Sequence, residues 1–284
     1  EPTGEGGVRV ELYEKPGAAW DKPKPGAKCT LSFTVGVRGE EEGETQPARP
    51  LHTAHAVEIE VGGDNPEEVT EGLEIAVEQM VLGQQAHVVV KPEYGYGAAG
   101  REGWVTGNEL LIYHVTLDKH LPAPSVHQMS SADKRQFSYA LKARGNTAFK
   151  GGDTRRARRL YTAALAPFVH VDAIADPDEK KEAVAVRSAC YLNLAACHDR
   201  MASWPEALAA CNQVLTHESS SKALFRRARA NLFLDRLLQA RQDLDKLHAQ
   251  DACDKAVVAL MAEVRKKEKA QDAKDRATFS RMFI

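Results

Sequence analysis

Two patterns of apolar residues divide the chain. Up to about residue 120, apolar and polar residues alternate in short segments, which is typical of half-buried β-strands. Four such segments stand out, at residues 29–37, 57–61, 87–90 and 110–117. Between the second and third, Val69, Leu73, Ala76, Val77 and Met80 fall at helical spacing, and Gly83 is expected to end that helix. One helix packed on an antiparallel sheet is an α+β unit.

From about residue 130 the pattern is helical, and it repeats. A small residue recurs at Ala157, Ala207 and Ala240, followed four positions later by Tyr161, Cys211 and Leu244 and preceded by twelve positions by Gly145, Ala195 and Ala228. The last two copies are 33 residues apart and the first two 50. A period near 34 with these slots resembles tetratricopeptide repeats, which are helix pairs that stack into a superhelix with a concave groove. The residues by which the first interval exceeds this period are expected to form helix extensions and a longer connection.

The repeats predict a specific set of helices. They are residues 136–149, 153–165, 181–201, 205–216, 222–234 and 237–249, followed by a long helix at 255–283. Val258, Met261 and Val264 give this last helix an apolar stripe, and the polar run after it is expected to project into solvent. The predicted domains are therefore residues 1–122, three repeats at 130–250 and a C-terminal extension helix at 254–284.

Charge and composition narrow the class of protein. Residues 1–124 carry 10 Lys and Arg against 21 Asp and Glu, a net charge of −11, whereas the remainder carries +9. This asymmetry favours different partners for the two halves, although it also simply keeps both surfaces soluble. No basic stripe interleaved with aromatic residues indicates nucleic-acid binding, and no apolar run or signal peptide indicates a membrane. The Glu-Pro start without Met suggests a fragment of a longer protein.

The five cysteines lack the spacing of a metal site or a redox motif. None forms a CxxC pair, and most lie in helical patterns. We expect reduced, buried thiols in a cytoplasmic protein, with a nuclear location left open, and neither a metal nor a cofactor.

Three motifs in the first half resemble one known family. The segments GLEIAVEQMVLGQ, KPEYGYGAAG and NELLIYHVTL, preceded by PxxGxxC, are similar to the FK-binding-protein (FKBP) type of peptidyl-prolyl isomerase domain over about 100 residues. Followed by repeats, the domain resembles the large FKBP immunophilin co-chaperones. It looks most like their second, repeat-adjacent and non-catalytic FKBP domain.

The resemblance also implies a degraded active site. Active members line a dry pocket with aromatic side chains and one Asp, which together hold a twisted prolyl amide. Here Phe33 stands where Tyr is usual, Val57 replaces a Phe, Leu73 replaces the floor Trp, and Pro47 and Ala48 fall near a Phe-Asp pair. Val69, Tyr96 and Tyr113 fit the pattern and Trp104 lies near the mouth, although both tyrosines also suit core positions. No Asp lies between Asp21 and Asp64, so a shift in alignment cannot restore the acid.

Five residues in the repeats resemble the two-carboxylate clamp, the set of five groove side chains with which a subset of tetratricopeptide repeats binds a C-terminal carboxylate. They are Lys142 and Asn146 on the first helix, Asn193 on the third, and Lys222 and Arg226 on the fifth. A spacing of four puts each pair on one helix face. Lys supplies a point charge, Arg a fork of donors, and Asn amide donors without charge, all of which suit a carboxylate. Each alone would be an ordinary surface residue, so the matched set carries the prediction.

The resemblance therefore implies an adaptor co-chaperone that binds the acidic C-terminal tail of heat-shock protein 90, Met-Glu-Glu-Val-Asp. Heat-shock protein 70 and client proteins are further candidate partners. Calmodulin is another, at the basic, partly amphipathic last helix, which resembles a family tail for which calmodulin binding has been proposed. The alternative from another class is an active prolyl isomerase recruited to that chaperone.

Overall fold

The chain folds as two compact units, residues Glu1–Met129 and Ser130–Ile284. The structure, a computed structural model, describes residues 7–13, 21–37 and 49–282, with side chains up to residue 276 apart from Arg49. Each unit has its own hydrophobic core.

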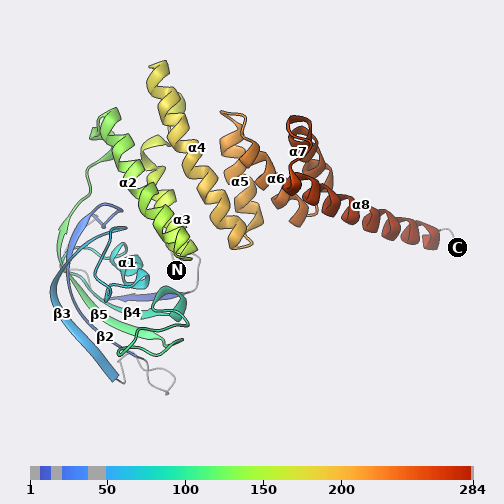
Figure 1. The fold of residues 1–284 in the computed structure, drawn as a ribbon. Helices are drawn as coiled ribbons and strands as arrows, with labels where there is room; N and C mark the ends of the chain where they lie inside the picture. The colour runs from blue at the N-terminus through green and yellow to red at the C-terminus, as the bar shows by residue number, and fades with distance from the viewer. Residues whose placement is uncertain (1–6, 14–20, 38–48, 283–284) are drawn as a thin grey trace. The chain divides into compact units, whose positions relative to one another are not determined.

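The first unit is a single helix packed against a five-stranded sheet (Figure 1). The strands are β1 (Val8–Leu12), β2 (Lys28–Val37), β3 (Arg49–Glu60), β4 (Gln85–Val90) and β5 (Leu111–Leu121), in the antiparallel order β1-β4-β5-β2-β3. Helix α1 spans Glu71–Val77, and short 3₁₀ turns follow at Pro92–Tyr94 and Val126–Gln128. The predicted α+β class is confirmed.

Three details of this unit differ from the sequence prediction. Strand β1 was not among the four predicted, β3 begins at Arg49 rather than at residue 57, and Gly83 does not end the helix. Helix α1 ends at Val77, where the bonding pattern changes to that of a tighter 3₁₀-type turn. The Met80 amide there donates to the Val77 carbonyl, three residues earlier, at 3.1 Å. Gly83 instead lies in the following turn at φ 74°.

The second unit is a series of helix pairs. The pairs are α2 (Ser131–Lys150) with α3 (Thr154–Ala164), α4 (Pro177–Arg200) with α5 (Trp204–Leu215), and α6 (Ser221–Phe233) with α7 (Leu237–Gln250), followed by α8 (Lys255–Met282). The first helix of each pair contacts the first helix of the next, from α2 to α4 to α6 to α8. All nine small and large slots named above are buried, as a packed repeat requires.

Local capping explains where two helices begin. The predicted start of α2 at Gln136 is five residues late, because the Ser130 hydroxyl accepts the Asp133 amide at 3.1 Å and caps the helix there. Helix α4 begins at Pro177 rather than Lys181, with the Asp176 carboxylate accepting the Glu179 amide at 2.8 Å. The predicted helix extension and longer connection are confirmed, since 3₁₀ turns at Ala166–Phe168 and Val171–Ala173 fill the rest of the interval.

The apolar face of α8 is rotated from the predicted stripe. Val257, Leu260 and Val264 are buried, Met261 is half-buried, and Val258 is exposed. After Val264 the described side chains are almost all exposed, and α8 continues past α7 in Figure 1. No helix in the described part of the chain is long and apolar enough to cross a lipid bilayer.

Most of the cysteines follow the prediction. Cys29, Cys190, Cys197 and Cys211 are free and buried, whereas Cys253, in the turn before α8, is exposed.

A close contact between α1 and β4 gives a test of the first unit. A Cβ atom added at Gly72 would lie 2.4 Å from Cγ1 of the fully buried Val90, so Gly72→Ala must push the helix off the sheet. We expect a loss of about 1–3 kcal/mol of stability, as for overpacked cores, measured by urea unfolding. Gly151→Ala is the control, because its Cβ would meet nothing closer than 3.5 Å. Equal stability of the two variants would contradict this packing.

Candidate functional site

The five predicted clamp residues lie on the three successive first helices. Lys142 and Asn146 are on α2, Asn193 is on α4, and Lys222 and Arg226 are on α6. Lys222 is exposed and the other four are half-buried, as expected of side chains that line a groove. Helix α4 contacts both α2 and α6, so Asn193 lies on the helix between those that carry the two Lys-containing pairs.

Asn146 and Asn193 are joined by a hydrogen bond. The Asn193 Nδ2 donates to Asn146 Oδ1 at 3.1 Å, and the Tyr161 hydroxyl donates to the same oxygen at 2.8 Å. Both bonds use the acceptor of the Asn146 amide, which leaves its two N–H donors for a ligand. The structure thus brings two of the predicted residues, Asn146 and Asn193, into direct contact.

Tyr161 is a residue whose role the sequence analysis missed. It was identified only as the large slot of the first repeat, and it is 2% exposed. Its ring lies against Gly145, where an added Cβ would come within 2.7 Å of the ring. The Tyr161 hydroxyl could have indicated this role. The corresponding positions of the other two repeats are Cys211 and Leu244, which have no hydroxyl.

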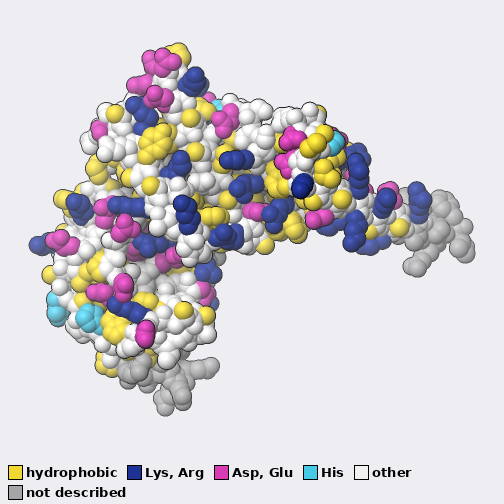
Figure 2. Space-filling model, viewed as in Figure 1, with side chains coloured by type: hydrophobic (Ala, Val, Ile, Leu, Met, Phe, Trp, Pro, Cys, Tyr) yellow, Lys and Arg dark blue, Asp and Glu magenta, His cyan; other side chains and the backbone are white. Residues whose placement is uncertain are grey.

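The basic clamp residues lack acidic partners, unlike several neighbouring arginines. Arg227 binds Asp243 through two bonds of 2.7 Å, Arg229 lies 3.1 Å from Asp199, and Arg135 lies 2.9 Å from Glu182. Within the described residues, Lys142, Lys222 and Arg226 form no such ion pair. The side of the helices that carries the clamp residues therefore keeps uncompensated positive charge. Figure 2 shows Lys and Arg side chains grouped on one face of these helices and along α8.

Buried thiols lie beside the same cations. Burial raises the pKa of Cys190 and of Cys197 to about 11 and that of Cys211 to about 12. The charge of Lys142 opposes this shift at Cys190, and the charge of Arg226 opposes it at the other two. The thiols are therefore neutral at pH 7 and leave the positive charge of the groove undiminished.

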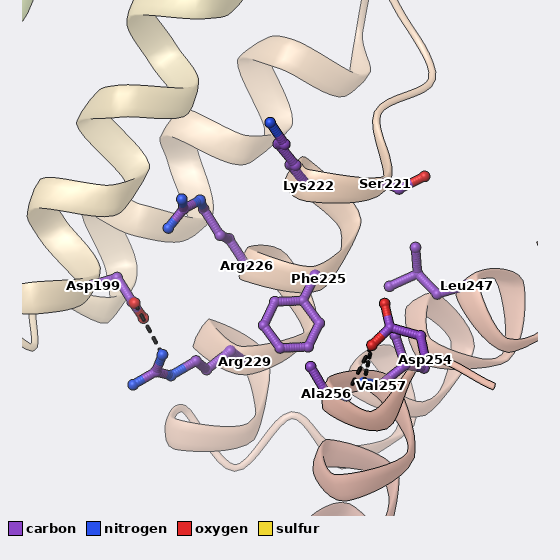
Figure 3. Close-up of a pocket in the computed structure, with 10 residues that line it drawn as sticks. All are labelled: Asp199, Ser221, Lys222, Phe225, Arg226, Arg229, Leu247, Asp254, Ala256 and Val257. Atoms are coloured by element: carbon purple, nitrogen blue, oxygen red, sulfur yellow. Dashed lines mark hydrogen bonds and ion pairs between the residues drawn. The ribbon is translucent and has the colours of Figure 1, made fainter. Parts of the chain in front are cut away.

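A cavity adjoins the last two clamp residues. It has a volume of about 300 Å³ and lies among α4, α6, α7 and α8. Figure 3 shows Lys222 and Arg226 along α6, with Phe225 directed toward the start of α8.

In the first unit, the predicted pocket residues pack as a filled core. Phe33 and Tyr113 meet edge to face with ring centroids 5.8 Å apart, and both are buried, as are Leu73 and Val69. Val57, half-buried, packs against the same core. Pro47 and Ala48 lie outside the described residues.

Both tyrosine hydroxyls are already engaged within the protein. The Tyr113 hydroxyl lies 3.2 Å from the Glu68 carbonyl and 3.2 Å from the Thr70 hydroxyl. The Tyr96 hydroxyl donates to the Glu67 carbonyl at 3.0 Å. Burial raises the pKa of each phenol, so both stay protonated.

An arginine stacks on the aromatic residues at the predicted mouth. The Arg101 guanidinium lies 4.2 Å from the Trp104 ring centroid and 5.8 Å from that of Tyr96. It also pairs with Glu67 at 3.0 Å. Arg101 was not among the predicted site residues, and its guanidinium lies over the Trp104 ring.

Comparisons with known proteins agree with this architecture. A model of the FKBP-type peptidyl-prolyl cis-trans isomerase family matches residues 19–118. Peptidyl-prolyl cis-trans isomerase FKBP4 from Bos taurus is 29% identical over 98% of this chain and 59% of its own length, and its Mus musculus counterpart is 30% identical over 79% and 49%. The chain thus spans about half the length of the curated relatives it matches.

A solved structure of a multi-domain immunophilin from Arabidopsis thaliana is 25% identical, covering 85% of this chain and 94% of that one. Its TM-score of 0.41 is too low to support an argument. The first relative, in contrast, aligns across both the FKBP-type unit and the helix pairs. The chain therefore belongs to the large FK-binding-protein immunophilins, in which an FKBP-type domain is followed by tetratricopeptide repeats.

Proposed function

We propose that the protein is an adaptor co-chaperone whose repeats bind the acidic C-terminal tail of heat-shock protein 90. The observation that carries this proposal is the contrast between paired and unpaired cations. Among the described residues, Lys142, Lys222 and Arg226 have no acidic partner, whereas Arg227 and Arg229 on α6 do. Unpaired cations beside bonded asparagine amides suit a ligand that supplies more than one carboxylate.

The two ends of the proposed site carry different donors and suit different carboxylates of the peptide. Asn146, held by Tyr161 and Asn193, offers neutral donors beside Lys142, which suits a terminal carboxylate. Lys222 and Arg226 lie one turn apart on α6 and suit an acidic side chain further along the same peptide. The tail Met-Glu-Glu-Val-Asp carries both kinds of carboxylate, and a tail of heat-shock protein 70 with the same ending would compete.

We also propose that the FKBP-type unit is catalytically silent. Leu73 stands at the expected pocket floor, the two tyrosine hydroxyls are bonded to the protein, and Arg101 covers Trp104. The alternative, an active isomerase, is favoured by the printed names of the matched relatives. Those names belong to proteins about twice the length of the matched segment, so the activity need not reside in this unit.

The clamp predicts a strict requirement for the peptide's terminal charge. Acetyl-Met-Glu-Glu-Val-Asp should bind with a Kd in the micromolar range, about −8 kcal/mol. Amidation of its C-terminus, or Arg226→Ala or Lys222→Ala, should each weaken binding by about 2 kcal/mol, because a carboxylate or its partner is left unpaired in the groove. Calorimetric titration measures all three.

Lys246→Ala is the matched control, since Lys246 is an exposed residue on α7 outside the clamp. It should bind the peptide like wild type. Unchanged affinity for the amidated peptide would remove the clamp assignment.

Tyr161 should act as a positioning residue for Asn146. Tyr161→Phe keeps the ring but loses the bond to Asn146, so affinity for the free peptide should fall by about 1 kcal/mol. Affinity for the amidated peptide should barely change, which a purely structural defect would not explain. Gly145→Ala should weaken binding more, because its Cβ displaces the Tyr161 ring. Equal loss with both peptides in Tyr161→Phe would contradict the assigned role.

Catalysis by the first unit is tested with a short proline peptide. We expect no acceleration of cis-trans isomerisation above the uncatalysed rate, and no binding of the family's macrolide ligands. A clear rate enhancement that a macrolide abolishes would show that the unit is an enzyme. Arg101→Ala, which uncovers the Trp104 ring, and Leu73→Trp, which restores the Trp expected at the pocket floor, are informative companions.

A further inference from the structure

Tyr139 on α2 lies on the same helix face as two clamp residues. Positions 139, 142 and 146 are three and four apart, so Tyr139, Lys142 and Asn146 follow one another along that face. The Lys142 Nζ lies 5.7 Å from the centroid of the Tyr139 ring. Within the described residues the Tyr139 hydroxyl forms no hydrogen bond. A hydroxyl without a bonding partner in that part of the chain therefore lies one turn from a cation of the proposed clamp.

Tyr139 differs in exposure from the other two tyrosines of the helical unit. It is 52% exposed, whereas Tyr161 is 2% exposed and Tyr191 packs half-buried against the core. Its neighbour Phe137 packs against Leu141 and α3, but Tyr139 belongs to none of the hydrophobic clusters of the described residues. The Tyr139 side chain therefore adds little to packing and is accessible from solvent.

The start of α2 is packed loosely enough for an enzyme to reach Tyr139. Among residues 131–140 only Ser138 is buried, whereas Leu141 begins the part of α2 that is buried against Leu160 and Ala164 of α3. Segments with few buried contacts open locally at a low cost in free energy. Such opening gives a protein kinase, which binds an extended substrate segment, access to this tyrosine.

The charges around Tyr139 suit a phosphate on its hydroxyl. A phosphoryl group carries a charge of about −1.5 to −2 at pH 7 and three acceptor oxygens. Arg135 lies four residues before Tyr139 and Lys142 three residues after it, both on the same face. Arg135 already pairs with Glu182 at 2.9 Å, whereas Lys142 has no acidic partner among the described residues. A phosphate at Tyr139 would therefore bind Lys142 through a charge-assisted hydrogen bond.

We propose that Tyr139 is a phosphorylation site and that its phosphate closes the peptide site. A tyrosine kinase transfers the γ-phosphoryl group of ATP to the phenolic oxygen of Tyr139. The new O–P bond replaces the bond to the leaving ADP, and the phenol gives up its proton. The phosphate then pairs with Lys142 and repels an acidic peptide. This proposal rests on the proposed function, because it concerns the regulation of the same site.

The site is tested by incubating the full chain with ATP and a tyrosine kinase of broad specificity, followed by mass-spectrometric mapping. Phosphate should appear at the two exposed tyrosines, Tyr139 and Tyr13, and not at the buried Tyr161. Saturating acetyl-Met-Glu-Glu-Val-Asp should lower the equilibrium extent of phosphorylation at Tyr139 alone, because the coupling between two ligands of one site is reciprocal. Modification of Tyr13 with none at Tyr139 would overturn the proposal.

The effect on binding is measured by calorimetric titration of the full chain with phosphotyrosine introduced at position 139 during synthesis. This protein should bind acetyl-Met-Glu-Glu-Val-Asp about thirtyfold more weakly than the unmodified protein, because the peptide loses Lys142 and meets a like charge. In Lys142→Ala the phosphate has no such cation to bind, so the same modification should weaken binding by only about threefold.

Phosphotyrosine at position 13 is the matched control, because Tyr13 is 50% exposed and lies in the first unit. It should leave the affinity for the peptide unchanged. Equal affinities of the unmodified protein and the protein phosphorylated at Tyr139, or an equal loss in Lys142→Ala, would overturn the proposal while leaving the clamp intact. Failure of the unmodified protein to bind the peptide would instead contradict the proposed function itself.

Discussion

The helical unit depends on the packing of a large side chain against a small one in each repeat. In the first repeat the Tyr161 ring occupies the space that a Cβ at Gly145 would fill, and Ala228 and Leu244 hold the corresponding slots of the third. Only the first repeat adds a hydroxyl at this slot, and that hydroxyl holds Asn146. The contact that joins two helices therefore also orients Asn146, so a substitution there would alter both the packing and the proposed binding site.

The two units differ in whether the polar side chains at their candidate sites are paired within the protein. In the FKBP-type unit, the hydroxyls of Tyr96 and Tyr113 are hydrogen-bonded within the protein, and Arg101 stacks on Trp104, which leaves little for a ligand to gain from these groups. In the repeats, Lys142, Lys222 and Arg226 have no acidic partner in the part of the chain that the structure describes. Uncompensated like charge lowers stability, and a bound polyanion would restore it. This contrast is the physical reason for proposing that the chain binds a peptide through its repeats and that its FKBP-type unit is silent.

Much of the fold was predictable because the repeat spacing is strong. Helices α3, α5, α6 and α7 begin and end within about one residue of the prediction. The early start of α2 was readable from the capping motif Ser130–Asp133, and β1 was readable from the alternation of Val8, Val10 and Leu12 with charged residues. The face of α8 was misplaced because adjacent valines, Val257 and Val258, fit two stripes equally well. The role of Tyr161 and the presence of the cavity at α8 depend on contacts between distant segments, which periodicity does not encode.

The central claim is that a free carboxylate binds at the paired asparagines, and side-chain amide NMR tests it most directly. The Nδ2–H resonances of Asn146 and Asn193 report on a ligand at that point, and Asn212, which accepts a bond from Arg227 on α6, serves as an internal reference. Titration with Met-Glu-Glu-Val-Asp should shift the Asn146 and Asn193 signals strongly and the Asn212 signal little, and the amidated peptide should shift none of them at the same concentration. Saturable binding that leaves Asn146 and Asn193 unshifted, or equal shifts with both peptides, would contradict the account.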